Sequence, residues 1–313
     1  MIVIDAHCDT LLKVTKENSL YDLGNLSHLD IKRAINNVNL QVFAAYIESS
    51  FKPFQSLQRG LALIETFHQE IEKIPHDVKL VLNKRDLLSI KNKDILHVLL
   101  AVEGGEILSG DILLLRTLFR LGVRSIGLTW NQRNDIADGC SESVTNGGLT
   151  SFGIKVVEEM NNLGMIIDLA HISPAGFWSA LEHTKSPLMV SHANCQKICP
   201  HRRNLDDAQI KALSQNHGVM GITFVRDFLG KGRIGIEDVI RHIDYAVNLG
   251  GVDCVGLGSD FDGIDTLPEG LDNVTKLYLI EESLSKRGYT SQDIGKIMGG
   301  NFLRLFTSVL PER

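Results

Sequence analysis

The sequence predicts an α/β fold, a single (β/α)8 barrel of the TIM type that spans residues 1–313 as one domain. Eight short runs rich in Val and Ile recur along the chain, and several are apolar throughout, as expected of parallel strands buried on both faces. Amphipathic segments separate them, and no Pro/Ser linker, low-complexity stretch or fixed-period repeat divides the chain. The alternation of strands and helices does not prove that the sheet closes into a barrel, so a doubly wound open sheet remains the alternative.

The elements can be placed in order along the chain. The expected strands are residues 1–7, 40–48, 95–103, 123–130, 165–171, 187–193, 218–224 and 254–260. The expected helices are residues 110–122, 150–164, 173–184, 236–250 and 275–288. Four of these helices end at a Gly, a common stop signal, and the segment 173–184 opens with Ser-Pro, a cap followed by a favoured first helical residue. The intervals 10–40 and 50–90 each have room for more than one further helix.

Composition narrows the class of protein. Hydrophobic residues make up 43% of the chain, enough for a large core, and the net charge of −6 argues against a nucleic-acid partner. No apolar run is long enough to span a membrane, and no signal peptide or lipid-anchor signal is recognisable. The five Cys residues are scattered and odd in number, so we expect no disulfide framework and favour a cytoplasmic location.

Residues that commonly bind metal ions stand at the ends of the expected strands. His7 and Asp9 follow the first strand, one residue apart, and because side chains alternate along a strand they should point the same way. Four more stand at the ends of later strands: Glu103, His171, His192 and Asp260. In a barrel all carboxyl ends of the strands meet at one face, where such enzymes keep their active sites.

The residue types suit a metal centre. Three His and several carboxylates are typical ligands of Zn²⁺, and one carboxylate can bridge two ions through its two oxygens. Two ions about 3.5–4 Å apart can share a water and lower its pKa. A further carboxylate can take the proton from that water and return it to a leaving group.

Each of these residues also has an ordinary explanation. A single His is more often a hydrogen-bonded structural residue, Asp9 could cap a helix, Glu103 could belong to a turn, and Asp260 could form an Asx-turn. Their joint placement favours a metal site, whereas seven of the eight other His, all but His201, are expected to be structural or solvated. The motif HRRN at 201–204 is either a solvated pair of Arg or a fork that binds a substrate carboxylate.

The chain resembles the membrane (renal) dipeptidase family of the amidohydrolase superfamily almost from end to end. The motifs that carry the resemblance are IDAHCDTL (4–11), VEGGE (102–106), LGMIIDLAHIS (163–173), SPLMVSHANCQKICPHRRNLDD (186–207), VGLGSDFDG (255–263), LPEGLDNV (267–274) and IMGGNFLRLF (297–306). The resemblance implies a (β/α)8 barrel that holds two zinc ions per chain and hydrolyses dipeptides. It also implies a homodimer and tolerance of a D-residue at the C-terminal position of the substrate.

The resemblance assigns a role to each matching residue. His7, Asp9 and Glu103 would hold the first zinc, and Glu103 would bridge to a second one. His171 and His192 would hold this second zinc. Asp260 would be the general acid/base that serves the metal-bridging hydroxide, and Arg203 would bind the C-terminal carboxylate of the substrate.

The chain departs from the mammalian pattern in the segment LTWNQRN (128–134). Mammalian members have LTHSCN there, with a His that contacts the substrate and could stabilise an oxyanion. Here Trp130 takes that place, and a larger, never-charged indole should change the pocket and the preferred substrate. The segment VRDFLGKGRIG (225–235) also lacks a clear match to the substrate Tyr of the mammalian forms.

Sequence alone thus predicts a zinc-dependent dipeptidase with a small-molecule substrate. One alternative is another binuclear metal hydrolase of this barrel type, which would act on a carboxylate-bearing amide. The other is a degenerate, non-catalytic barrel, prompted by Trp130, although the presence of all five expected metal ligands and Asp260 argues against it.

Overall fold

The computed structural model describes all residues, 1–313, and contains a closed barrel of eight parallel strands. Its strands, in the order in which they pair around the barrel, are β1 (Ile4–Cys8), β2 (Leu40–Tyr46), β4 (Leu96–Glu103), β5 (Val123–Gly127), β6 (Ile166–Asp168), β7 (Met189–Ala193), β8 (Val219–Ile222) and β9 (Val255–Leu257). β9 pairs with β1, so the sheet closes, and the open-sheet alternative is wrong. Each strand overlaps one predicted from the sequence.

One further strand was not predicted. β3 (Val78–Leu80) pairs with the first residues of β4 and lies outside the closed ring. Lys79 interrupts its short apolar segment, so β3 does not show the continuous apolar character of most barrel strands. It falls in the interval 50–90, for which only further helices were considered.

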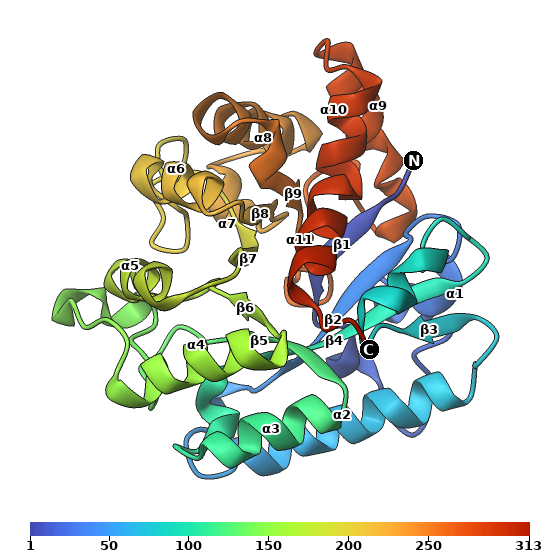
Figure 1. Cartoon of the computed structure of the whole chain (residues 1–313). Helices are drawn as coiled ribbons and strands as arrows, with labels where there is room; N and C mark the ends of the chain where they lie inside the picture. The colour runs from blue at the N-terminus through green and yellow to red at the C-terminus, as the bar shows by residue number, and fades with distance from the viewer.

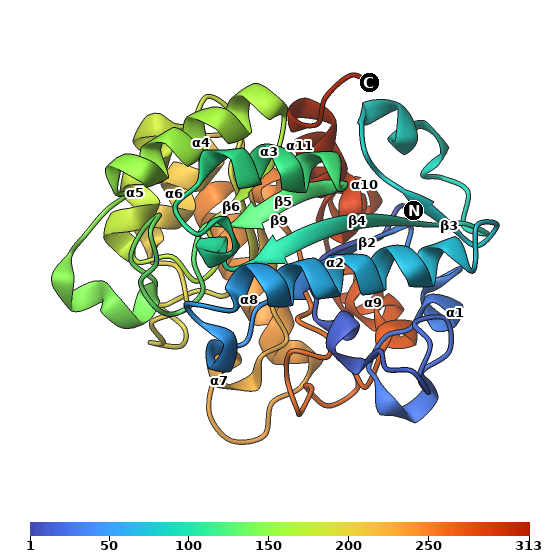
Figure 2. The same cartoon turned by 90° about the horizontal axis from the view of Figure 1, so that it is seen from below.

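Helices surround the strands (Figure 1). They are α1 (Ile31–Ala34), α2 (Ser56–Glu72), α3 (Ile112–Arg120), α4 (Ser151–Leu163), α5 (Pro174–His183), α6 (Asp207–Gln215), α7 (Arg226–Leu229), α8 (Ile236–Gly250), α9 (Tyr278–Lys286), α10 (Ser291–Gly295) and α11 (Asn301–Val309). All five predicted helices are present, and Ser173 caps α5 by accepting a hydrogen bond from the Gly176 N–H at 3.0 Å. The view turned by 90° shows α2 running alongside β2 and β4 (Figure 2). No helix combines the length and apolarity needed to cross a bilayer.

The apolar core has two parts. The larger cluster of 68 buried residues lies between the barrel strands and the helices. The smaller cluster of 17 joins inward-facing side chains near the starts of the strands, such as Ile4 and Leu40, to Phe302 and Phe306 of α11. α11 therefore covers the amino end of the barrel and leaves the carboxyl end to the loops.

Two barrel strands contain a register shift near their carboxyl ends. In β1 the pairing with β2 shifts between Asp5 and Cys8, and in β7 the pairing with β8 shifts between Val190 and Ala193. Ile4 and Ala6 belong to the inner cluster, so strict alternation would turn His7 towards the helices. The shift interrupts the alternation and aims His7 over the barrel mouth, as a β-bulge does. The same reasoning holds for His192.

Candidate metal centre

A cavity of about 360 Å³ opens at the carboxyl ends of the strands. All but one of the predicted site residues line it: Asp9, Glu103, Trp130, His171, His192, Arg203 and Asp260. The exception, His7, is buried next to it, with Nε2 3.4 Å from an oxygen of Asp9. The barrel thus brings together all eight residues from six of its strands and the loops that follow them.

The first group of potential ligands comes from β1 and β4. Nε2 of His7 lies 3.4 Å from Oδ2 of Asp9 and 3.4 Å from Oε2 of Glu103. Asp9 stands at the start of a short 3₁₀ turn but makes no side-chain capping hydrogen bond, so the capping explanation is wrong. Three donor atoms of this group lie within 4.8 Å of one another, close enough to share one ion.

The second group faces the other oxygen of the same carboxylate. Oε1 of Glu103 lies 2.8 Å from Nε2 of His171 and 3.6 Å from Nε2 of His192. The two imidazole nitrogens are 2.9 Å apart. Glu103 therefore presents one oxygen to each group, which is the arrangement that a bridging carboxylate requires.

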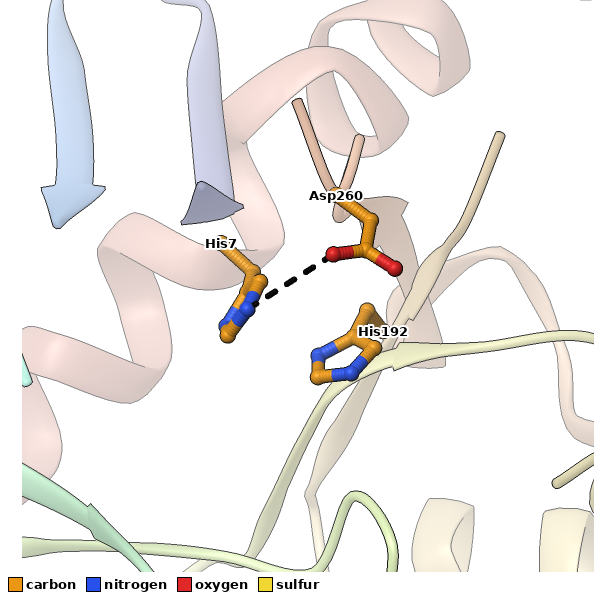
Figure 3. Close-up of side chains that lie close together, drawn as sticks. All are labelled: His7, His192 and Asp260. Carbon is orange, nitrogen blue, oxygen red and sulfur yellow. Dashed lines mark ion pairs between the residues drawn. The ribbon is translucent and has the colours of Figure 1, made fainter. Parts of the chain in front are cut away.

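Asp260 stands beside both groups. Its Oδ1 lies 3.8 Å from Nε2 of His7, and Figure 3 shows His192 below the same carboxylate. No backbone N–H donates to the Asp260 carboxylate, so this residue does not form an Asx-turn. Asp260 and His171 both have a positive φ, +63° and +69°, a costly backbone conformation for residues other than Gly. Such strain is common where a site fixes the direction of a side chain.

Hydrogen bonds set the orientation of the two imidazoles in the second group. Nδ1 of His171 lies 2.8 Å from Oδ1 of Asn131, an oxygen that can only accept, so Nδ1 carries the hydrogen. Nδ1 of His192 lies 2.8 Å from the hydroxyl of Ser191. A neutral His171 then points the lone pair of Nε2 at Glu103. Metal-binding His residues in general have partners of this kind.

Burial and mutual repulsion perturb the acidic groups strongly. Burial, together with the nearby charge of Glu103, raises the pKa of Asp9 to about 8. Burial also raises the pKa of Asp260. For Glu103, burial acts to raise the pKa, but the positive charge of His7 holds this pKa well below the usual range. Burial lowers the pKa of His171 to about 3, assisted by the positive charge of Arg203.

The donor set fits divalent metal ions. Nε2 of His7 and Oδ1 of Asp9 are buried without any hydrogen-bond partner, a costly state that an ion would relieve. A Cβ at Gly263 would stand 2.2 Å from Oδ2 of Asp9 and 2.4 Å from Oδ1 of Asp260, so only Gly leaves room for these carboxylates. Imidazole nitrogens and carboxylate oxygens suit zinc and similar ions.

Arg203 lies at one side of the cavity. Its guanidinium is buried, donates to the carbonyl of His192 at 3.0 Å through Nη2, and has no partner for Nε. Asn204, the last residue of HRRN, fixes the loop by donating to the carbonyls of Cys199 at 2.9 Å and Phe228 at 2.8 Å. A buried cation with free donors is poised for an anionic ligand, so the solvated-pair explanation does not hold for Arg203.

Comparison with known proteins identifies the family. The family model described as membrane dipeptidase (peptidase family M19) matches residues 1–311. The chain belongs to the membrane dipeptidase family. An uncharacterised dipeptidase of Schizosaccharomyces pombe is 33% identical over 97% of this chain and 79% of its own length. The dipeptidase verJ of Clonostachys rogersoniana is 34% identical over 82% of this chain and 66% of its own length.

Solved structures agree with this membership. A metallopeptidase from Rhodobacter sphaeroides, liganded with a phosphinate mimic of the dipeptide L-Ala-D-Ala, has a TM-score of 0.91 and 25% identity, with 99% of each chain covered. The dipeptidase AC, a family M19 metallopeptidase, has a TM-score of 0.92 and 26% identity, again with 99% of each chain covered. The chain is therefore a metallo-dipeptidase, a peptide hydrolase with a (β/α)8 barrel, as the sequence motifs predicted.

Trp130, the departure from the mammalian pattern, lines the cavity of this family member. Its ring centroid lies 5.6 Å from that of His171 and 5.4 Å from that of Tyr46. The indole therefore packs beside a potential metal ligand and narrows the cavity on that side.

Several lining residues were not singled out from the sequence. They are Leu12, Tyr46, Asn131, Val225, Phe228, Asp262, Gly263 and Ile264, whereas the lining residues His201 and Arg202 belong to the HRRN motif. Tyr46 could have been found, because it ends a strand as Glu103 does, and the two are paired in register. Asn131 carried no signal, since a single Asn in a loop is usually a turn residue. None of the eight other His, His201 included, belongs to a potential metal-binding group.

Proposed function

We propose that this chain is a zinc-dependent dipeptidase that cleaves dipeptides with a free C-terminal carboxylate. The observation that carries the proposal is the Glu103 carboxylate, which turns one oxygen to His7 and the other to His171. In this proposal His7, Asp9 and Glu103 hold one zinc ion, and Glu103, His171 and His192 hold a second. The two ions would supply Lewis acidity to the scissile carbonyl and to the attacking water.

The protein residues perform the remaining tasks. Arg203 binds the substrate carboxylate through its free guanidinium donors and so fixes the scissile bond over the metal centre. Asp260 accepts the proton of the attacking water and donates it to the leaving amine. Its donor oxygen lies close to the imidazoles of His7 and His192, which supports this role.

A D-residue at the C-terminal position is part of this proposal. The relative from Rhodobacter sphaeroides is liganded with a mimic of L-Ala-D-Ala, and its fold superposes over nearly the whole of this chain. Arg203 would hold the carboxylate of either stereoisomer, since the guanidinium contacts that carboxylate and not the side chain.

The test combines metal analysis with a substrate panel. Metal content is measured on the purified protein, on the chelated protein and after zinc is restored, and each form is assayed with L-L and L-D dipeptides. We expect two zinc ions per chain, loss of activity on chelation and recovery with zinc. Zinc binding without hydrolysis of any dipeptide would support the degenerate barrel, and cleavage of carboxylate-bearing cyclic amides alone would support another metal hydrolase.

Two variants test the assigned roles. Asp260→Asn should keep its zinc but lower kcat by about 100- to 10,000-fold, because proton transfer loses its carrier. Arg203→Met should raise KM for free dipeptides about tenfold or more, because a charged hydrogen bond is lost. Dipeptide amides, which lack the carboxylate, serve as the control and should be cleaved equally by Arg203→Met and the native protein.

A further inference from the structure

We propose that Tyr46 and Trp130 form the wall that selects the N-terminal side chain of the dipeptide, and that the Lys52–Glu106 ion pair braces this wall. The proposal rests on the dipeptidase function proposed above. It makes Tyr46 and Trp130 specificity-determining residues, and Lys52 and Glu106 positioning residues. The substrates it favours have short N-terminal side chains.

The topology sets Tyr46, one side of this wall, opposite Arg203. Around the ring the strands follow the order β1, β2, β4, β5, β6, β7, β8 and β9, so β2 faces β7 across the barrel. Tyr46 ends β2, and Trp130 follows β5, whereas Arg203 is bonded to the carbonyl of His192 in β7. A dipeptide that places its carboxylate at Arg203 and its scissile bond over the centre must direct its N-terminal residue to the far wall.

Trp130 is held by groups from three different elements. Its indole lies 5.4 Å from the Tyr46 ring and 5.6 Å from the His171 ring, measured between centroids. The ammonium of Lys52 sits over the indole, 4.9 Å from the ring centroid, and 5.7 Å from that of Tyr46. A cation and the face of an aromatic ring attract each other, and the attraction is stronger when both groups are shielded from water.

Lys52 is itself held in place. Its side chain is 11% exposed and forms an ion pair with Oε1 of Glu106, whose side chain is 9% exposed. Oε2 of Glu106 accepts a hydrogen bond at 2.9 Å from Nδ2 of Asn134, which also donates to the carbonyl of Leu128 at 2.9 Å. The pair is thus anchored to the same loop that carries Trp130.

The backbone of this loop has little freedom to retreat. The Ser141 N–H donates to the carbonyl of Asn131 at 2.9 Å, and a Cβ at Gly139 would stand 2.2 Å from the carbonyl oxygen of Trp130. Only Gly permits this approach of the segment after 139 to the backbone of Trp130. A bulky substrate side chain therefore meets a wall that neither the side-chain contacts nor the backbone allow to move.

The size of the cavity determines which side chains fit. About 360 Å³ is near the lower end of the range for small-molecule sites, about 300–1,000 Å³, and both substrate residues must share it. Gly or Ala at the N-terminal position leaves Trp130 undisturbed, whereas Phe or Trp would have to displace it. We therefore expect the enzyme to select dipeptides by the size of their N-terminal side chain.

The experiment measures kcat/KM for two series of dipeptides. One series varies the N-terminal residue (Gly-Ala, Ala-Ala, Leu-Ala, Phe-Ala, Trp-Ala), and the other varies the C-terminal residue (Ala-Gly, Ala-Leu, Ala-Phe). The native protein should favour Ala-Ala over Phe-Ala by more than about tenfold. Trp130→Leu should reduce this ratio about tenfold, and the double variant Lys52→Met with Glu106→Gln should reduce it about threefold.

The double variant removes both charges because either partner alone would remain buried and unpaired. Lys84→Met is the matched control, since Lys84 pairs with Glu312 at 2.7 Å at a site remote from the cavity, and its profile should equal that of the native protein. Lys52→Arg keeps the cation and should retain the native ratio. A simple loss of stability would lower every kcat/KM alike and would leave the ratios unchanged.

Two results would overturn the inference. One is a native protein that cleaves Phe-Ala as well as Ala-Ala, and the other is an equal shift of the N-terminal and C-terminal series in the double variant. Failure of the proposed function is distinguishable, since the native protein would then cleave no member of either series. A change in the relative kcat/KM values of the double variant that is confined to the N-terminal series supports both the wall and the ion pair that braces it.

Discussion

At its amino end the barrel is filled by apolar side chains, whereas at its carboxyl end it holds buried charges and unpaired polar atoms. Phe302 and Phe306 of α11 close the amino end, and Gly256 of β9 leaves room for the ring of Phe302, since a Cβ there would stand 2.4 Å from it. At the other end, Nε2 of His7 and Oδ1 of Asp9 have no hydrogen-bond partner. The apolar amino end stabilises the fold, whereas the buried polar groups of the carboxyl end lower its stability and form the site.

The comparison predicts that a change at the carboxyl end abolishes activity and leaves the fold intact. In Glu103→Gln the carboxylate that faces both groups of ligands becomes a neutral amide with a single acceptor oxygen. Bound metal should be lost, and activity should fall by at least about 1,000-fold, because metal ions contribute several kcal/mol to the transition state. Metal analysis and a dipeptide assay measure these effects, and circular dichroism should show native secondary structure. A variant that keeps two metal ions and full activity would refute the bridging role.

A substitution in the apolar amino end should lower the free energy of unfolding and leave activity unchanged. Phe306→Ala removes a fully buried ring from the inner cluster and should lower the free energy of unfolding by about 3–5 kcal/mol. Urea titration of the native protein and the variant measures this difference. At a temperature where both are folded, kcat should be unchanged, and a loss of kcat without a loss of stability would contradict the division between the two ends.

The partner of His171 should influence metal affinity more than fold stability. Asn131→Leu keeps the size of the side chain but removes the oxygen that accepts from Nδ1 of His171. Metal affinity should fall about 10- to 100-fold, as measured by competition with a chelator. Cys140→Ala is the control, since it removes the thiol that donates to the same Asn131 oxygen at 3.0 Å and leaves the hydrogen bond between Asn131 and His171 in place. Equal losses in the two variants would indicate a general loosening of the loop.

The last prediction concerns the pH dependence of the free energy of unfolding, to which the buried residue His242 contributes. His242 of α8 accepts from the Cys195 N–H at 3.0 Å through Nδ1, and its Nε2 donates to the Leu229 carbonyl at 3.0 Å. Burial lowers its pKa from 6.5 to about 4, so between pH 7 and pH 5 the unfolded chain gains a proton that the folded chain does not. Stability should therefore fall by about 2 kcal/mol over this interval through His242.

The variant His242→Gln isolates that contribution, because Gln can donate and accept but does not titrate in this range. Denaturant titrations at pH 7 and pH 5, with a chelator present to exclude effects of metal, should show a smaller acid-induced loss in the variant. The same loss in both proteins would show that His242 does not control the acid response.

Most of the fold followed from the sequence, because the eight barrel strands carry apolar runs and four of the five predicted helices end at a Gly. The strand β3 and the helices α6, α7 and α10 were not predicted, since the local pattern is weak where an element is held mainly by its neighbours. The positions of the site residues were predictable from the common carboxyl face of the barrel. Their fine orientation was not, because it depends on contacts such as Asn131 with His171, which join residues 40 apart in the chain.

The register shifts in β1 and β7 have a consequence for protein engineering. An idealised barrel with perfect alternation would turn both His7 and His192 outward, even if every residue of the centre were copied to its proper position. A transplant of this centre into a designed scaffold must therefore carry two backbone irregularities along with the side chains. Conversely, deleting or adding one residue within either strand would rotate one imidazole out of the centre without altering the composition of the site.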